Sequence, residues 1–199
     1  MTAAVEPPPT VAPARWTVRA AQRPARVVGP EAGPVTLGLL ADTHGWLDPA
    51  LLEHFQGAAF VLHAGDVGDP EILTALEAVA PVVAVRGNID GGALADLPLE
   101  ALVEVAGRRV ALRHIAGSPA RPNAETRALV ESARPDVLVV GHSHIPVAGR
   151  VGDLLWINPG AAGRHGFHDL RTAGLLRLDA EGEPTFFRIH LGPRSGRGA

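Results

Sequence analysis

The 199-residue sequence contains neither cysteine nor lysine. Without cysteine there is no disulfide framework, no thiolate zinc site and no cysteine nucleophile, so a bound metal would depend on His, Asp, Glu or Asn side chains. Without lysine there is no Schiff base and no phosphate-gripping lysine of a P-loop, which removes the central residue of an ATPase. These two absences exclude several classes of enzyme.

Aromatic residues, basic runs and long apolar stretches are also scarce. Tyrosine is absent, and three Trp and five Phe leave few side chains on which bases could stack. The net charge is -3 and no run of basic residues occurs, so we expect no long nucleic acid as a partner. No apolar stretch approaches the roughly 20 residues that span a bilayer, and the N-terminus lacks the apolar core of a signal peptide. We therefore expect a soluble, cytoplasmic protein with no membrane partner.

The apolar residues, 46% of the chain, suffice for the core of one sizeable domain. Residues 1–34 are rich in Pro, Ala and Arg without helical or strand periodicity, and we interpret them as a flexible N-terminal extension. Residues 193–199 are rich in Gly and Arg and are interpreted as a flexible tail. The domain itself is expected to span residues 35–192.

In the first half of this domain, apolar runs alternate with helix-like segments. Strands are predicted at 35–40, 58–62 and 82–85, and helices at 49–55 and 70–79. The strands lack polar alternation, which is typical of parallel strands buried on both faces, with the helices as right-handed crossovers. This half is therefore predicted to be α/β.

The second half has a different texture. A hairpin is predicted from the runs 101–105 and 109–112, followed by a helix at 123–133 and a buried strand at 137–140. Three amphipathic strands, expected to be antiparallel, follow at 153–157, 174–178 and 185–189. Two packed sheets with helices outside would accommodate all of these elements.

Metal-binding side chains follow five of the predicted strands, where α/β folds place their ligands. They are Asp42, His44, Asp66, Asn88, His114, His142 and His144. Oxygen and imidazole donors without thiolate favour Mn²⁺, Fe²⁺, Zn²⁺, Ni²⁺ or Co²⁺. Seven ligands exceed the need of one ion, whereas two ions about 3.5 to 4 Å apart, sharing a carboxylate and a bridging hydroxide, would use them all. Such a site would be positively charged and would attract a phosphate ester.

The spacing of these residues resembles the signature of the calcineurin-like metallophosphoesterase superfamily, D-x-H, G-D, G-N-x-D, H and G-H-x-H. The motifs read Asp42-Thr43-His44, Gly65-Asp66, Gly87-Asn88-Ile89-Asp90, His114 and Gly141-His142-Ser143-His144. The short length, Arg86 and the segment 157–160 resemble the small prokaryotic YfcE-type phosphodiesterase branch. The resemblance implies a two-sheet α/β/β/α sandwich that hydrolyses small phosphodiesters or phosphomonoesters with two divalent ions, Mn²⁺ foremost.

The resemblance also implies a role for each residue. The first metal would be held by Asp42, His44 and His144, the second by Asn88, His114 and His142, and Asp66 would bridge both. Catalysis is assigned to Asp66, Asn88 and His114, and substrate binding to Asn88 and Arg86. Arg86 either contacts phosphate or pairs with Asp90 to brace its loop.

Two positions depart from the family pattern. Ile89 stands where many superfamily members carry a His that assists the leaving group, so a general acid is missing there, and His165 is a candidate replacement. His114 is followed by Ile115 where relatives often have Gly, which makes the substrate wall bulkier and less polar. The family resemblance therefore implies the reaction class and leaves the natural substrate open.

Several alternatives stay open. The same fold could serve as a protein-interaction scaffold, or as a nuclease acting on short or cyclic nucleotides, and a homo-oligomer is possible. Trp46 either walls the pocket or packs on the first helix. Asn158 and Gly160 are interpreted as turn residues. The His residues outside the motifs are interpreted as surface or hydrogen-bonded core residues: His54, His63, His168 and His190.

Overall fold

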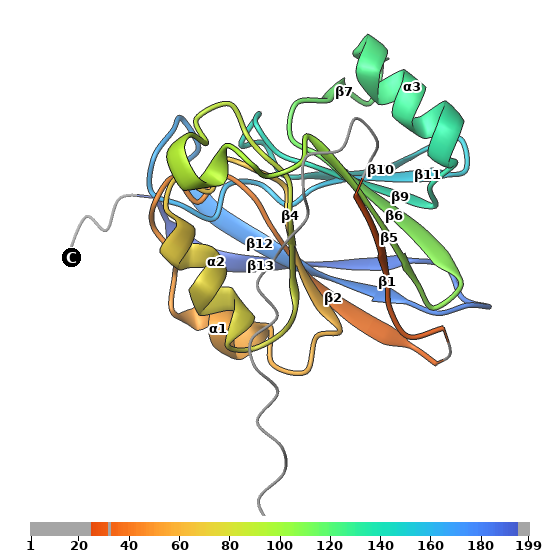
Figure 1. Cartoon of the computed structure of the whole chain (residues 1–199), viewed down its shortest axis with the longest axis horizontal. Coiled ribbons are helices and arrows are strands. Elements are labelled where there is room, and N and C mark those ends of the chain that lie inside the picture. The colour runs from red at the N-terminus through yellow and green to blue at the C-terminus, as the bar shows by residue number, and fades with distance from the viewer. Residues whose placement is uncertain (1–24, 32, 195–199) are drawn as a thin grey trace, which may run out of the picture.

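The computed structural model describes residues 25–31 and 33–194, and in them the apolar runs form two β-sheets that pack face to face (Figure 1). The five-stranded sheet has the order β13-β12-β2-β3-β4. Its strands are β2 (Val35–Leu40), β3 (Phe60–His63), β4 (Val82–Ala84), β12 (Leu170–Leu178) and β13 (Thr185–Pro193). The first three are parallel to one another, as predicted, and β12 joins β2 antiparallel.

The six-stranded sheet has the order β1-β5-β6-β9-β11-β10. Its strands are β1 (Ala25–Val28), β5 (Glu100–Val105), β6 (Arg108–Arg113), β9 (Val137–Val140), β10 (Val147–Val151) and β11 (Leu154–Asn158). β5 and β6 form the predicted hairpin, and β9 pairs with β6 in parallel. A small separate hairpin consists of β7 (Gly117–Ser118) and β8 (Arg121–Pro122).

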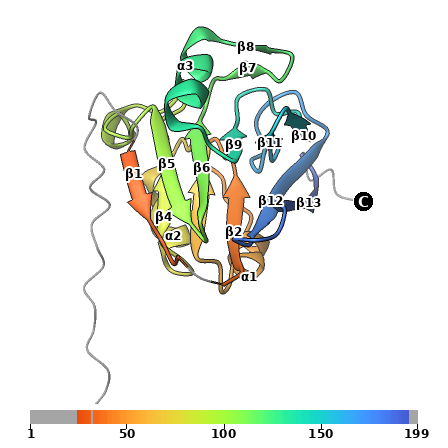
Figure 2. The ribbon, with the colours of Figure 1, turned by 90° about the vertical axis from the view of Figure 1, so that its right-hand side faces the viewer.

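Helices cover the outer face of each sheet (Figure 2). α1 (Ala50–His54) and α2 (Pro70–Glu77) lie on the five-stranded sheet, α3 (Ala124–Ala133) lies on the six-stranded sheet, and a 3-10 turn, η1 (Gly92–Leu94), follows β4. α2 begins where the Asp69 carboxylate accepts the Glu71 N–H, and α3 where the Asn123 side chain accepts the Thr126 N–H.

Three apolar layers hold these elements together. The central layer lies between the sheets and includes Leu37, Leu62, Leu112 and Val139, all completely or almost completely buried. Phe55 anchors the layer under α1 and α2, and the third layer lies under α3. The fold is therefore an α/β/β/α sandwich, and the prediction of this architecture is confirmed.

The N-terminal boundary of the domain was predicted wrongly. Residues 25–31 were assigned to the flexible extension, but β1 pairs in parallel with β5, and Val27 packs against the central core. Arg26 forms an ion pair with Glu104 on β5. A four-residue strand beside a Pro-rich segment is too short to show periodicity. Its pairing partner, β5, lies far along the chain, so no local pattern indicates the pairing. Residues 1–24 of the predicted extension and 195–199 of the predicted tail lie outside the described residues.

The last strands also differ from the prediction. The segment 153–157 was predicted to be amphipathic and antiparallel, but β11 is buried throughout and lies between β9, to which it is parallel, and β10, to which it is antiparallel. β10 and the small hairpin were not predicted. β13 runs through Pro193, one residue past the predicted end of the domain. Its antiparallel pairing with β12 is as expected.

Among the described residues, no helix combines the length and apolar character needed to cross a membrane.

Candidate metal centre

The predicted metal ligands come together at the carboxyl ends of five strands. The loops after β2, β3 and β4 contribute four of them, and the loops after β6 and β9 on the other sheet contribute three. These residues are Asp42, His44, Asp66 and Asn88 from the five-stranded sheet and His114, His142 and His144 from the six-stranded sheet. The cluster thus depends on the packing of one sheet on the other.

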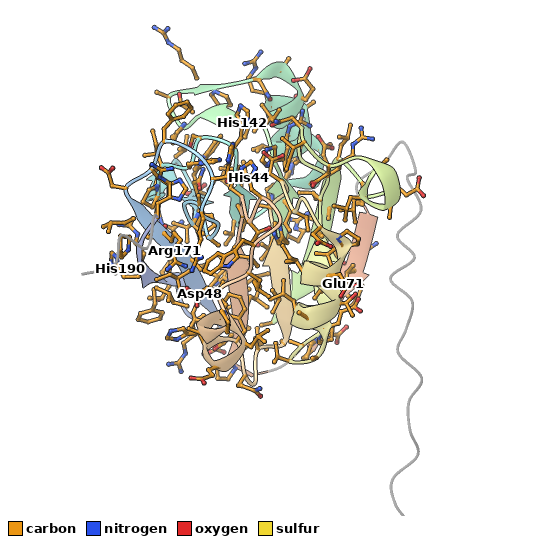
Figure 3. The ribbon with its side chains drawn as sticks, turned by 90° about the vertical axis from the view of Figure 1, so that its left-hand side faces the viewer. His44, Asp48, Glu71, His142, Arg171 and His190 are labelled. Atoms are coloured by element: carbon orange, nitrogen blue, oxygen red, sulfur yellow. The ribbon has the colours of Figure 1, made fainter. Side chains whose placement is uncertain are left out.

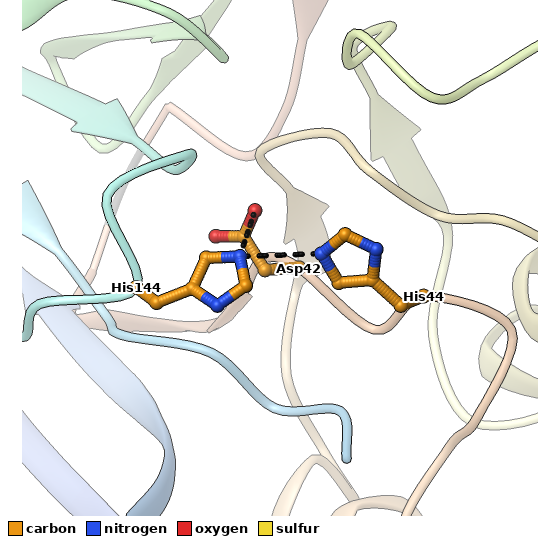
Figure 4. A group of neighbouring side chains, drawn as sticks. All are labelled: Asp42, His44 and His144. Atoms are coloured by element: carbon orange, nitrogen blue, oxygen red, sulfur yellow. Dashed lines mark hydrogen bonds and ion pairs between the residues drawn. The ribbon is translucent and has the colours of Figure 1, made fainter. Parts of the chain in front are cut away.

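One half of the cluster is formed by Asp42, His44 and His144 (Figure 4). Nε2 of His144 lies 3.4 Å from Oδ1 of Asp42 and 3.2 Å from Nε2 of His44. Nε2 of His44 lies 3.7 Å from Oδ2 of Asp66. Three ligand-type atoms, carried by the loops after β2 and β9, therefore converge on one point.

The other half closes the ring. Oδ1 of Asp66 lies 3.3 Å from Nε2 of His114, which in turn lies 3.1 Å from Oδ1 of Asn88. That oxygen is 2.9 Å from Nδ1 of His142, whose backbone N–H donates to the Asp42 carboxylate at 3.0 Å. All seven residues are therefore linked in one closed set of contacts.

Both carboxylates reach across the two halves. A carboxylate oxygen of Asp42 lies within 4.8 Å of the ring nitrogens of His44 and His144 on one side, and within 4.8 Å of the ligand atoms of Asp66 and His114 on the other. Asp66, which the family resemblance makes the bridging ligand, contacts His44 with one oxygen and His114 with the other. The pair of carboxylates therefore connects the two halves of the cluster.

The backbone at this site is strained. Five of the seven residues have positive φ angles: Asp42 (55°), His44 (48°), Asp66 (54°), His142 (68°) and His144 (58°). The left-handed region costs non-glycine residues about 1–3 kcal/mol each and persists only where the surrounding structure enforces it. Here the packed sheets hold these loops in the left-handed conformation, in which the side chains point to a common centre.

The contacts of the His114 ring indicate whether a cation fits beside its Nε2. Nδ1 of His114 lies 2.8 Å from the Ala64 carbonyl, so the ring donates its N–H there and presents the Nε2 lone pair to Asn88 and Asp66. A lone pair facing two oxygen acceptors is unfavourable unless a proton or a metal ion lies between them. The donor set of imidazole, carboxylate and amide oxygen therefore fits a divalent cation.

The pKa shifts of His114 and Asp66 also favour a positive charge at this position. Burial lowers the pKa of His114, but the hydrogen bond to Asp66 and the charge of Asp42 outweigh it, and the net pKa is raised. Burial raises the pKa of the Asp66 carboxyl, yet the His114 hydrogen bond and the Ile89 N–H leave the net pKa lowered. The anion at Asp66 and a cation beside it stabilise each other.

Arg86 and Asp90 do not form the pair considered from sequence. The Asp90 carboxylate accepts the backbone N–H groups of Gly68 and Gly87, bracing two ligand-bearing loops. Arg86 donates to the Ala95 carbonyl and lines a pocket of about 270 Å³. The other residues lining that pocket are Gly87, Asn88, Asp90, Leu99, Arg113, His114 and Ile115. An open space with a guanidinium wall thus adjoins two of the candidate ligands.

Asn158 has a larger role than the predicted turn. Its side-chain amide donates to the Gly141 carbonyl at 2.8 Å and to Oγ of Ser143 at 3.0 Å, and its oxygen accepts the Gly160 N–H. The buried amide therefore holds the strained loop that carries His142.

Trp46 contacts two arginine side chains, one in the loop 160–168 and one on β12. The Arg164 guanidinium stacks 3.9 Å from the centre of the Trp46 ring, and that of Arg171 lies 4.6 Å away. Arg171 is fixed by an ion pair with Asp48 (Figure 3). The stack holds the loop over His44, and the ring of His165 lies 5.3 Å from that of His44.

His63 is buried and hydrogen-bonded, as the sequence suggested, and it links two loops that carry candidate ligands. Its Nε2 lies 2.9 Å from Oγ1 of Thr43, whose hydroxyl donates to the Val67 carbonyl, so the ring N–H donates to Thr43. Its Nδ1 accepts the Gly65 N–H at 3.2 Å. Burial lowers the pKa of His63 to about 4. The ring is therefore neutral at pH 7.

The metal-free protein is expected to lose stability on acidification because of His63. Between pH 6.5 and about 4 the unfolded chain takes up a proton that the folded His63 resists, so the free energy of unfolding falls as the pH falls, by up to about 3 kcal/mol. His63→Gln keeps an N–H donor near Thr43 but cannot titrate. Urea unfolding from pH 7 to 4 should show a shallower loss in this variant, and equal slopes would contradict the assignment.

The chain is similar in sequence to known phosphoesterases. A model of the calcineurin-like phosphoesterase superfamily domain matches residues 35–181. A probable metallophosphoesterase of Methanothermobacter thermautotrophicus is 33% identical over 150 residues, covering 73% of this chain and 87% of that protein. A probable metallophosphoesterase of Methanocaldococcus jannaschii is 33% identical over 137 residues, covering 65% and 69%.

Solved structures share the architecture. An archaeal phosphodiesterase has a TM-score of 0.63 at 25% identity, covering 78% of this chain and 99% of that one. A single mutant of Vps29 from Entamoeba histolytica also has a TM-score of 0.63, at 19% identity over 79% of this chain and 99% of its own, a likeness in fold alone. Since the family match spans most of the domain, the chain belongs to the calcineurin-like phosphoesterase superfamily.

Proposed function

We propose that this phosphoesterase hydrolyses small phosphodiesters with two divalent metal ions. The observation that carries the proposal is the closed set of seven ligand-type residues, in which lone pairs face one another and only positive charge can relieve them. The relatives named as probable metallophosphoesterases and the archaeal phosphodiesterase support the reaction class.

We assign the seven residues to two ions as the family resemblance implies. Asp42, His44 and His144 would hold the first ion. Asn88, His114 and His142 would hold the second, with Asp66 shared between the two ions. When bound, the ions would supply a Lewis acid that lowers the pKa of water and neutralises phosphoryl charge. Nitrogen and oxygen donors without sulfur suit Mn²⁺, our first expectation, and also Fe²⁺, Co²⁺, Ni²⁺ and Zn²⁺.

The chain's own side chains would orient the ester. The pocket of about 270 Å³ begins at Asn88 and His114 and is large enough for one ester substituent of a small phosphodiester. Arg86 on its wall would bind a phosphoryl oxygen or an anionic substituent. Leu99 and Ile115, which are 56% and 40% exposed, give the remaining wall an apolar character.

The alternatives have less support. A protein-interaction scaffold draws only on the fold likeness to Vps29 and does not require a strained ring of ligand-type residues. Cleavage of short or cyclic nucleotides remains within the proposed reaction class, whereas the net charge of -3 argues against long nucleic acids.

Hydrolysis of bis(p-nitrophenyl) phosphate by the purified protein tests this proposal. Protein stripped with a chelator should be inactive and should regain activity with Mn²⁺, and p-nitrophenyl phosphate should be a poorer substrate. A metal-loaded protein that hydrolyses neither compound would favour the scaffold, and undiminished activity after complete metal removal would exclude the proposed chemistry.

Ile89 lies at the position where many family members carry a proton-donating His, and Ile89→His is expected to restore that donation. The Ile89 side chain is 47% exposed, and its N–H donates to Asp66 at 3.1 Å, so a His here would stand beside the centre. Turnover of alkyl esters should rise by about 10²-fold and that of nitrophenyl esters little, because only poor leaving groups need the proton. The measurement is the slope of log kcat against leaving-group pKa, with Ile89→Asn as the control. An unchanged slope would indicate that another group, such as His165, already donates the proton.

A further inference from the structure

His168 was interpreted from sequence as an ordinary surface or core histidine, but it contacts a candidate ligand. Its Nδ1 lies 3.2 Å from Nδ1 of His144. On the other side of the ring, its Nε2 lies 3.1 Å from the Gly163 carbonyl. His168 therefore connects the Gly163 end of its own loop with His144.

The order of these contacts fixes where each proton resides. A carbonyl can only accept, so Nε2 of His168 must carry the hydrogen that it donates to Gly163. In a neutral ring, Nδ1 of His168 is then an acceptor, and the hydrogen between the two rings belongs to Nδ1 of His144. His144 is thereby left with a lone pair on Nε2, the atom that faces Asp42 and His44.

A second observation shows that the loop shapes the position of the His144 ring. A Cβ on Gly166 would lie 2.2 Å from Nδ1 and 2.4 Å from Cε1 of His144, so the backbone of the loop packs directly on the ring. The Gly163 N–H also donates to the Asp42 carbonyl at 3.1 Å. The loop thus touches two of the three residues in this half of the centre.

We infer that His168 is a positioning residue for the first metal ion, selecting the tautomer of His144 whose Nε2 can bind the ion. This inference rests on the proposed two-metal function. The other half of the centre uses the same device with a different acceptor, because His114 donates its Nδ1–H to the Ala64 carbonyl. Loss of His168 should therefore weaken one site and leave the other unchanged.

Three substitutions separate the possible roles of His168. His168→Asn places an amide oxygen where Nδ1 was and keeps the acceptor for His144. His168→Gln places an amide N–H where Nε2 was and keeps the donor to Gly163. His168→Leu keeps neither. His190→Leu is the matched control, since this exposed histidine on β13 lies apart from His44 and His142 (Figure 3).

Calorimetric titration of the metal-free protein with Mn²⁺ gives the first readout. Leu and Gln variants should bind one of two ions about 10- to 100-fold more weakly, with the other affinity unchanged, while the Asn variant and the control resemble wild type. Retention of both sites in the Leu variant would overturn the inference. Retention in the Gln variant with loss in the Asn variant would assign His168 to loop anchoring instead. Wild-type protein that binds fewer than two ions would count against the proposed function itself.

The second readout needs no metal. In ¹⁵N spectra of the imidazole groups, His144 of the metal-free wild type and of the Asn variant should carry its proton on Nδ1, whereas the Gln and Leu variants should show a mixture of tautomers. A proton on Nε2 of His144 in the wild type would overturn the inference regardless of the metal titration.

Discussion

Replacing Asp66 with alanine is expected to abolish hydrolysis and two-ion occupancy together. Its carboxylate lies between His44, at 3.7 Å, and His114, at 3.3 Å, so the substitution removes an anionic ligand from both halves of the centre. Two cations would then repel each other with less compensation. Since metal clamps supply several kcal/mol of transition-state stabilisation, kcat/KM should fall by about 10³-fold or more.

The measurement pairs metal content per chain with diester hydrolysis. Asp153→Ala, in the exposed turn between β10 and β11, removes the same side chain away from the centre and should match wild type in both. Melting of the metal-free Asp66→Ala protein shows whether the fold persists. A variant that keeps two tightly bound ions and wild-type turnover would refute the shared-ligand assignment.

Gly87→Ala should be nearly as damaging, although the substitution adds a single methyl group. A Cβ at this position would lie 2.1 Å from both the backbone nitrogen and Oδ1 of Asp66. A backbone atom cannot move aside cheaply, so one of the two loops must shift, at a cost of about 1–3 kcal/mol. A displacement of about 1 Å in a catalytic site can lower the rate by about 10²-fold.

Gly91→Ala provides the matched control, because it lies four residues further along the same segment and its added Cβ would meet nothing within 4 Å. Thermal melting and diester hydrolysis of the two variants give the comparison. Gly87→Ala with wild-type activity and stability would mean that the β3 and β4 loops approach each other less closely than described.

Much of the centre could be predicted because its residues follow recognisable strands. Asp42, Asp66 and Asn88 each come shortly after a short buried run, and the carboxyl ends of parallel strands share one edge of a sheet. The helices were predictable from periodicity and caps in the same way. Local patterns therefore sufficed for the sandwich and for the set of candidate ligands.

The remaining features depend on contacts between distant segments. β1 is defined by its pairing with β5, and His168 acquires its role from His144, 24 residues away. Neither contact leaves a periodic signal in the sequence. The buried amide of Asn158 likewise supports the His142 loop through hydrogen bonds that only the folded chain reveals. Positive φ angles at five candidate ligand positions could not be predicted from Asp and His residues alone.

The dependence of hydrolysis on two metal ions can be measured by titrating the metal-free protein with Mn²⁺ and following calorimetry and bis(p-nitrophenyl) phosphate hydrolysis in the same samples. We expect two bound ions per chain and hydrolysis that reaches its maximum only as the second site fills. Full activity at one ion per chain, or binding of two ions without any hydrolysis, would contradict this expectation.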